Sequence, residues 1–252
     1  MYGVIIGDIV GSRFEWMPHN TKEFELFTSD CTPTDDSVLT VAVAEAIMSD
    51  NDFESHLRYW GLKYPNAGYG GAFLDWLMND FPAYNSYGNG SAMRVSPIGW
   101  MYENLEETRK MARMSAEVTH NHPEGVKGAE SVASAVWLAR NGHSKTQIKN
   151  YIQREFGYDL DRKVDDIRKT YQFDVTCQGS VPEAIICFLE ATDFEDAIRN
   201  AVSLGGDSDT QAAIAGSIAE AYFGIPEDLI KKCHKYLPHG MLKVVNKFYK
   251  EI

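Results

Sequence analysis

Apolar residues recur at helical spacing along most of this chain, and this pattern constrains the fold more than any other feature. Runs that alternate apolar and polar residues are scarce; Tyr2 to Ile6 and Tyr171 to Thr176 have some strand character, but two short runs do not make a sheet. The pattern therefore predicts an all-α protein, a compact orthogonal helical bundle. The clearest helical segments are Ser37 to Met48, Leu105 to Glu117, Gly125 to Arg140, Val181 to Ala191 and Gln211 to Phe223.

Residues that begin or end helices stand between these segments. Ser144 and Asp193 have the side chains favoured at helix N-caps, and Gly224 is placed to end the helix before it. Pro226 and Pro238 suit the openings of the helices that follow. No repeat, linker or compositional break divides the chain, so we expect residues 1–252 to form a single domain. Nothing resembles a coiled-coil seam, and we expect a monomer.

The charge of the chain excludes some partners. Its formal net charge is -12 and its sequence pI is near 5.0, whereas nucleic acid and anionic membranes require a basic surface. An acidic protein can still bind a diphosphate through local backbone donors. No apolar run approaches the roughly 20 residues that span a bilayer. Four scattered cysteines without zinc spacing, and no signal peptide, predict a cytoplasmic protein with reduced thiols.

Two acidic clusters each precede a helical segment. Thr34-Asp35-Asp36 alone fits a helix cap at least as well as a metal site, because Thr and Asp are favoured at caps and in first turns. Gly205-Gly206-Asp207-Ser208-Asp209-Thr210 carries more carboxylates than a cap needs, and adjacent carboxylates repel each other unless a cation lies among them. Hard divalent cations favour such oxygen ligands. Together the clusters predict a shared Mg²⁺ or Mn²⁺ site.

Two further segments are more polar or glycine-rich than a bundle requires. Ser86-Tyr87-Gly88-Asn89-Gly90 is a glycine-broken loop whose backbone N–H groups can hold phosphate oxygens, although most such runs are only turns. Asp8 and Glu15, seven residues apart, share a face if their segment is helical, and such a carboxylate pair suits either acid/base chemistry or a solvated surface. His120 and His122 alone do not define a zinc site.

In this order, these segments resemble those of the ADP-ribosylglycohydrolase family. The resemblance covers nearly the whole chain, and the motif that contains Asp207 and Asp209 is the most specific. The matching segments read GDIVGSRFE, PTDDSVLT, GYGGAFLDW, SYGNGSAMR, THNHPEGVKGAE, GSVPEA and LGGDSDTQAAIAGSIAEAYFGIP.

The resemblance implies a compact all-α fold and a binuclear Mg²⁺ or Mn²⁺ centre at the base of an ADP-ribose cleft. It places His120 near the ribose. It also puts Glu15 at an acidic position that acts in some members as a substrate gate or an acid/base residue. The implied metal ligands are Thr34, Asp35, Asp36, Asp207, Asp209 and Thr210, and the implied diphosphate loop is Ser86, Tyr87, Gly88, Asn89 and Gly90.

The expected reaction is metal-dependent hydrolysis of the glycosidic bond between ADP-ribose and an acceptor, which can be an ADP-ribosylated protein side chain or a small conjugate. The transition state has oxocarbenium character, and the candidates for base and charge stabilisation are Asp35, Asp36 and Glu15. Two alternatives stay open: hydrolysis of another small substrate on the same scaffold, and non-catalytic binding of ADP-ribose. The many packed carboxylates count against a purely structural protein.

Overall fold

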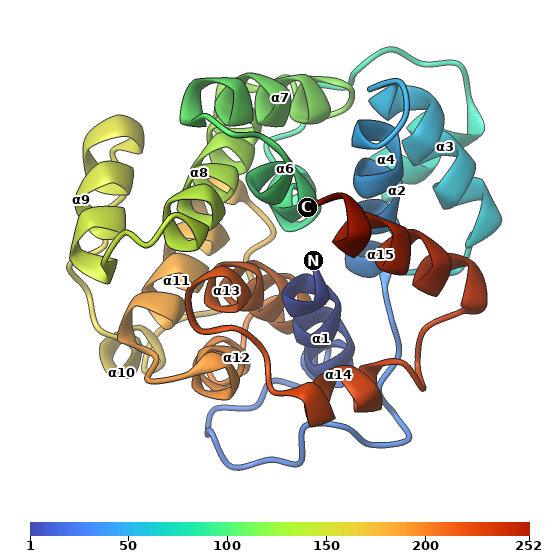
Figure 1. Cartoon of the computed structure of the whole chain (residues 1–252). Coiled ribbons are helices and arrows are strands. Elements are labelled where there is room, and N and C mark those ends of the chain that lie inside the picture. The colour runs from blue at the N-terminus through green and yellow to red at the C-terminus, as the bar shows by residue number, and fades with distance from the viewer.

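The structure is a computed structural model that describes all residues from 1 to 252, and it consists of helices joined by short connections (Figure 1). It contains no sheet; one isolated bridge joins Gly88 and Thr176. The helices are α1 (Tyr2–Gly11), η1 (Ser12–Phe14), α2 (Asp35–Ile47), α3 (Phe53–Lys63), α4 (Gly71–Met78), α5 (Gly90–Met93), α6 (Ser96–Met101), α7 (Leu105–Glu117), α8 (Pro123–Arg140), α9 (Lys145–Phe156), α10 (Val164–Ile167), α11 (Cys177–Glu190), α12 (Phe194–Val202), α13 (Ser208–Phe223), α14 (Glu227–Cys233) and α15 (His239–Glu251).

Helix α13 lies in the middle of the bundle, and α1, α8, α11 and α12 pack around it (Figure 1). Three glycines spaced by four residues let the backbones of α1 and α13 touch. A Cβ added at Gly3 or Gly7 would lie 2.1 Å from a carbonyl oxygen of α13, and one at Gly11 would lie 2.5 Å from the Cα of Asp209. No other residue fits such an approach. This contact brings Asp8, which lies between two of the glycines, beside the start of α13.

The helices confirm the all-α prediction, and the five segments with the clearest helical pattern are all helical. Helix α7 has the expected bounds, while α2, α8, α11 and α13 begin two to four residues earlier than the pattern indicated, at Asp35, Pro123, Cys177 and Ser208. The earlier starts place the acidic residues of α2 and α13 inside the first helical turn. Tyr2 to Ile6 is helical, and Tyr171 to Thr176 is an irregular loop.

The expected helix boundaries are present. Ser144 forms a capping box at the start of α9, and the Asp193 side chain accepts the N–H of Asp196 at the start of α12. Gly224 ends α13 with a φ of 74°, a conformation in which glycine is favoured. Pro226 and Pro238 precede α14 and α15, which lie over α1 and α2.

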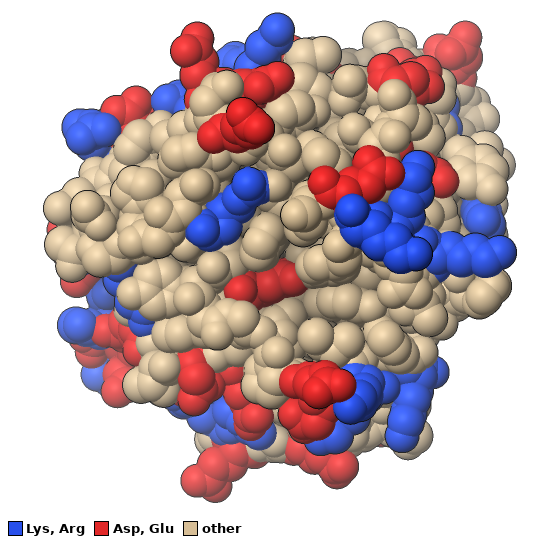
Figure 2. Space-filling view, in the orientation of Figure 1, with Lys and Arg blue, Asp and Glu red and all other residues tan.

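The surface charges and the cysteines agree with what the sequence indicated. On the face that Figure 2 shows, basic and acidic side chains are intermixed, and no basic patch dominates. All four cysteines are free thiols and buried. No helix has both the length and the apolar character that crossing a bilayer requires.

Candidate active site

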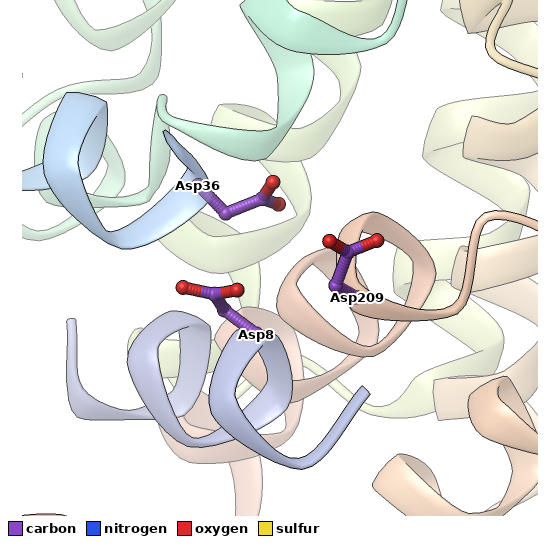
Figure 3. Close-up of side chains that lie close together, drawn as sticks. All are labelled: Asp8, Asp36 and Asp209. Atoms are coloured by element: carbon purple, nitrogen blue, oxygen red, sulfur yellow. The ribbon is translucent and has the colours of Figure 1, made fainter. Parts of the chain in front are cut away.

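Three helices bring buried carboxylates to one point. Asp8 comes from α1, Asp36 from the first turn of α2 and Asp209 from the first turn of α13, and their carboxylates face a common space (Figure 3). One oxygen of each lies within 4.8 Å of the others, and the same holds for Glu15, Asp207 and Asp209. Asp209 belongs to both groups and is therefore the centre of the cluster.

The start of α2 holds the first acidic cluster in place. Thr34 is the N-cap, and its hydroxyl accepts the N–H of Asp36 at 3.3 Å. The N–H of Asp35 donates to the carbonyl of Ala67 at 2.8 Å, which ties this turn to the loop before α4. Asp36 is buried, and its Oδ1 has no hydrogen-bond partner. The capping interpretation therefore holds for Thr34 and does not account for Asp36.

Asp8 anchors this turn, a role that sequence analysis missed. Its carboxylate accepts the N–H of Thr34 at 2.9 Å, the Thr34 hydroxyl at 2.7 Å and the N–H of Ser37 at 3.1 Å, and it also accepts the Ser37 hydroxyl. Asp8 thus caps α2 from another helix. Because the Thr34 hydroxyl gives its hydrogen to Asp8, its oxygen can still offer a lone pair to a cation. The glycine spacing on α1 was the available signal, since it predicts close contact with a second helix.

The start of α13 holds the second acidic cluster. Asp209 accepts the N–H of Thr210 at 2.9 Å, and the Thr210 hydroxyl donates to Asp36 Oδ2 at 3.3 Å, which joins the two clusters. Asp207 accepts the side-chain amide of Asn89 at 2.7 Å. Ser208 instead turns to the carbonyl of Gly206 and is fully buried. In this turn Asp207 and Asp209 therefore face the acidic cluster, whereas Ser208 between them faces the core.

The carboxylates raise one another's pKa. Burial and then the charge of Asp209 raise the pKa of Asp8 to about 7, and burial followed by the charges of Asp209 and Asp8 raises that of half-buried Glu15 to about 7. Burial and the charges of their acidic neighbours raise the pKa of Asp35 and Asp36 well above the usual range. No lysine, arginine or histidine forms a salt bridge with these four carboxylates, so burying them together costs free energy.

This donor set fits hard divalent cations. It offers carboxylate and hydroxyl oxygens only, and Asp36 Oδ1 is a buried acceptor without a donor. A bound cation would coordinate this oxygen, and its positive charge would offset the repulsion between the carboxylates. Nitrogen and sulfur ligands, which favour zinc, are missing from both groups.

Asp36 and Asp209 of the cluster, but not Asp8, line a cavity of about 490 Å³, which is within the size range of small-molecule sites. Glu15, Asp35, Asp36, Asp207, Asp209 and Thr210 all line it, together with Ser86, Gly88, Asn89, Gly90 and His120. The structure thus brings together most of the residues singled out in the sequence. Two of the residues do not line the cavity: Thr34, which caps α2, and Tyr87. The half-exposed ring of Tyr87 packs against His122, with 5.3 Å between the ring centroids.

The glycine loop forms one wall, and part of its donor capacity is already used. The N–H of Gly88 donates to the Ser86 hydroxyl at 3.1 Å, and that of Asn89 donates to the carbonyl of Val175 at 2.8 Å. Asn89 also joins the wall to the acidic cluster through Asp207. The loop is therefore rigidly tied to both the α11 side and the cluster, so that its position relative to a cation site is fixed.

Three wall residues had no clear signal in the sequence. Arg94 is fully buried beside the glycine loop. Trp16 and Phe173 stack at the rim of the cavity, with 5.4 Å between their ring centroids. Both rim aromatics are exposed, Trp16 at 76%. Only the fold brings these distant residues together. Among the aromatics before the loop, Tyr69 and Tyr84 line the cavity, while Trp76 belongs to the core.

Comparison with known proteins identifies the family of this chain. The family model described as ADP-ribosylglycohydrolase matches residues 1–252. The ADP-ribosylhydrolase ARH3 of Homo sapiens is 28% identical over 93% of this chain and 88% of its own length. The ADP-ribosylarginine hydrolase Tri1 of Pseudomonas putida (strain GB-1) is 25% identical over 92% of this chain and 72% of its own.

A solved structure supports the fold. The structure described as an ADP-ribosylglycohydrolase-related protein complex superposes with a TM-score of 0.78, covers 99% of this chain and 95% of its own, and is 24% identical. At that identity the likeness shows the all-α architecture alone. The match across the whole chain shows the family: this chain belongs to the ADP-ribosylglycohydrolases and is a hydrolase of that type.

Proposed function

We propose that this chain hydrolyses the glycosidic bond between ADP-ribose and an acceptor, with two divalent cations, Mg²⁺ or Mn²⁺, bound at the acidic cluster. The observation that carries the proposal is the convergence of buried carboxylates from α1, α2 and α13, of which those of α2 and α13 line one cavity. The proposed ligands are Thr34, Asp35, Asp36, Asp207, Asp209 and Thr210.

The cations would supply Lewis-acid charge beside the scissile bond. Proton transfer belongs to the protein, and the candidates are Asp35, Asp36 and Glu15. Glu15 is only half-buried and lines the cavity beside Asp207 and Asp209, so its carboxylate can reach a ligand bound there and exchange a proton with it. Asp36 is buried within the cluster, which suits charge stabilisation better.

The opposite wall would hold the ADP-ribose. Ser86, Gly88 and Gly90 line the cavity within a loop that is tied to its neighbours, and His120 lines it next to Gly90. Small residues here let the ligand approach the backbone closely. Because this wall is fixed to Asp207 through Asn89, a bound ribose is held at a defined position relative to the carboxylates, which is the positioning that intramolecular rate gains require.

A substrate panel tests the proposal. ADP-ribosyl-arginine, ADP-ribosyl-serine and O-acetyl-ADP-ribose are each incubated with the protein, with EDTA, and with Mg²⁺ or Mn²⁺ restored in excess. Release of ADP-ribose from at least one of them, lost in EDTA and restored by a cation, is expected. Binding of ADP-ribose without turnover of any conjugate would indicate a non-catalytic protein, and turnover of an unrelated nucleotide diphosphate alone would indicate another hydrolase.

A further inference from the structure

Arg94, at the end of α5, is a buried cation that forms no salt bridge, although the charge of Asp35 acts on it. Its side chain is fully buried and lines the cavity. Nη2 donates to the carbonyl of Ser115 at 3.1 Å and to the hydroxyl of Thr119 at 2.9 Å, while Nε and Nη1 have no partner. Burial lowers the pKa of Arg94 to about 10, so it stays charged at neutral pH. A buried charge of this kind is costly, and its two hydrogen bonds to one segment suggest a positioning role.

The Thr119 hydroxyl joins Arg94 to His120. A guanidinium donates hydrogen bonds and cannot accept them, so Thr119 Oγ1 accepts from Arg94. Its single hydrogen is then available for His120 Nδ1, which lies 2.7 Å away; the Tyr84 hydroxyl, which also hydrogen-bonds to Thr119, can donate its own hydrogen to Thr119 Oγ1. In this arrangement Nδ1 is the acceptor and the ring hydrogen is on Nε2.

His120 Nε2 faces the glycine loop. A Cβ at Gly90 would lie 3.1 Å from Nε2 and one at Gly88 would lie 3.6 Å from it, so the two glycines leave space in front of this nitrogen. The side chain is 5% exposed. Burial and then the charge of Arg94 lower the pKa of His120 well below its usual value, and the ring stays neutral. The wall therefore presents a single directed N–H.

We propose that Arg94 and Thr119 are positioning residues that fix His120 in its Nε2–H tautomer, as a hydrogen-bond donor to an oxygen of the bound ADP-ribose. Arg94 orients the Thr119 hydroxyl, and Thr119 orients the imidazole. His120 then binds the substrate and transfers no proton. The ligand in this statement rests on the proposed function, whereas the tautomer rests on the hydrogen bonds alone.

Nitrogen NMR of protein labelled with ¹⁵N-histidine reads the tautomer directly, with His120 assigned from the spectrum of His120→Gln. The wild type is expected to show Nδ1 as the unprotonated nitrogen and Nε2 as the protonated one at neutral pH. Thr119→Val, which keeps the shape but removes the hydroxyl, is expected to give a mixture of tautomers. Thr119→Ser is expected to restore the wild-type signals, and Thr108→Val, a buried control on α7 with its hydroxyl bonded to Asn104, to leave them unchanged.

Calorimetry of ADP-ribose binding to the metal-loaded protein gives the second readout. Thr119→Val should bind about tenfold more weakly, the effect of one well-aligned hydrogen bond, and Thr119→Ser should bind like the wild type. A wild-type spectrum with the hydrogen on Nδ1, or a valine variant with unchanged tautomer and affinity, overturns the proposal. The wild-type spectrum decides even if the valine variant does not fold. Failure of every conjugate to be hydrolysed would overturn the proposed function and leave the tautomer result standing.

Discussion

Replacing Asp8 by Asn tests whether this carboxylate supports the cation site. The carboxylate accepts two hydroxyls and two N–H groups at the start of α2, and the Thr34 hydroxyl is among them. An amide keeps one acceptor oxygen but presents a donor on the other side, so the Thr34 hydroxyl is expected to turn. Loss of such an outer partner typically weakens metal affinity about 10- to 100-fold.

The expected loss can be worked out for one cation. At a concentration of about 1,000 times the dissociation constant, a cation stabilises the wild type by about 4.1 kcal/mol, and a 100-fold weaker site retains about 1.4 kcal/mol. In a chain of this length each kcal/mol moves Tm by about 2 to 4 °C. The wild type should therefore gain about 8 to 16 °C on adding the cation, and Asp8→Asn about 3 to 6 °C.

Melting curves with and without Mg²⁺ or Mn²⁺ measure this difference. Without metal, Asp8→Asn should be as stable as the wild type or more so, because the amide removes a buried charge repelled by Asp209. Glu130→Gln is the matched control, because Glu130 is a buried carboxylate that pairs with Arg109 at 3.0 Å between α7 and α8. This substitution should lower Tm by the same amount with and without metal. An Asp8→Asn protein with the wild-type response to metal would refute the reasoning.

Three further outcomes are expected. In EDTA, the pKa values of Asp8 and Glu15 are higher in the folded protein than in the unfolded chain, so their protonation stabilises the fold at low pH, and this contribution is lost as pH rises through about 7. Tm measured by circular dichroism should therefore be higher near pH 5 than near pH 8, and a higher Tm at pH 8 would contradict this. Gly7→Ala places a Cβ 2.1 Å from the Ala212 carbonyl and should destabilise by at least about 1 to 3 kcal/mol in denaturant titrations, whereas Gly71→Ala, with open space around it, should not destabilise. Glu15→Gln should lower kcat about 100-fold or more with little change in ADP-ribose affinity; equal turnover in steady-state assays would exclude Glu15 from proton transfer.

Sequence patterns predicted the helices that have one polar face or clear caps. Helix α7 shows an apolar stripe and begins and ends where the pattern indicates. Helix α1 did not show such a pattern, because all ten of its residues are buried and its run of β-branched side chains resembles a strand. The contact with α13, made possible by Gly3, Gly7 and Gly11, decides its conformation. Tertiary packing of this kind overrides local propensity.

The candidate site was predictable where its chemistry is concentrated in short motifs. The Asp207–Thr210 cluster carries more oxygen ligands than a cap requires, the Thr34–Asp36 cluster gains its meaning only beside it, and the acidic residues of both line the same cavity. Arg94 and Thr119 gave no such signal, because a lone arginine or threonine is unremarkable until its burial and partners are known. Their function depends on a chain of hydrogen bonds between segments that only the fold brings together.

The most direct test of the cation-dependent hydrolase is Asp209→Asn, measured by melting temperature with and without Mg²⁺ or Mn²⁺ and by hydrolysis of the conjugate that the wild type cleaves. Asp209 is the one carboxylate that belongs to both acidic groups. The fold should survive, the metal-induced rise in Tm should nearly vanish, and turnover should fall by orders of magnitude. A protein in which Asp209 only caps α13 would instead lose about 1 kcal/mol of stability, keep the wild-type response to metal and remain fully active, and that result would contradict the account.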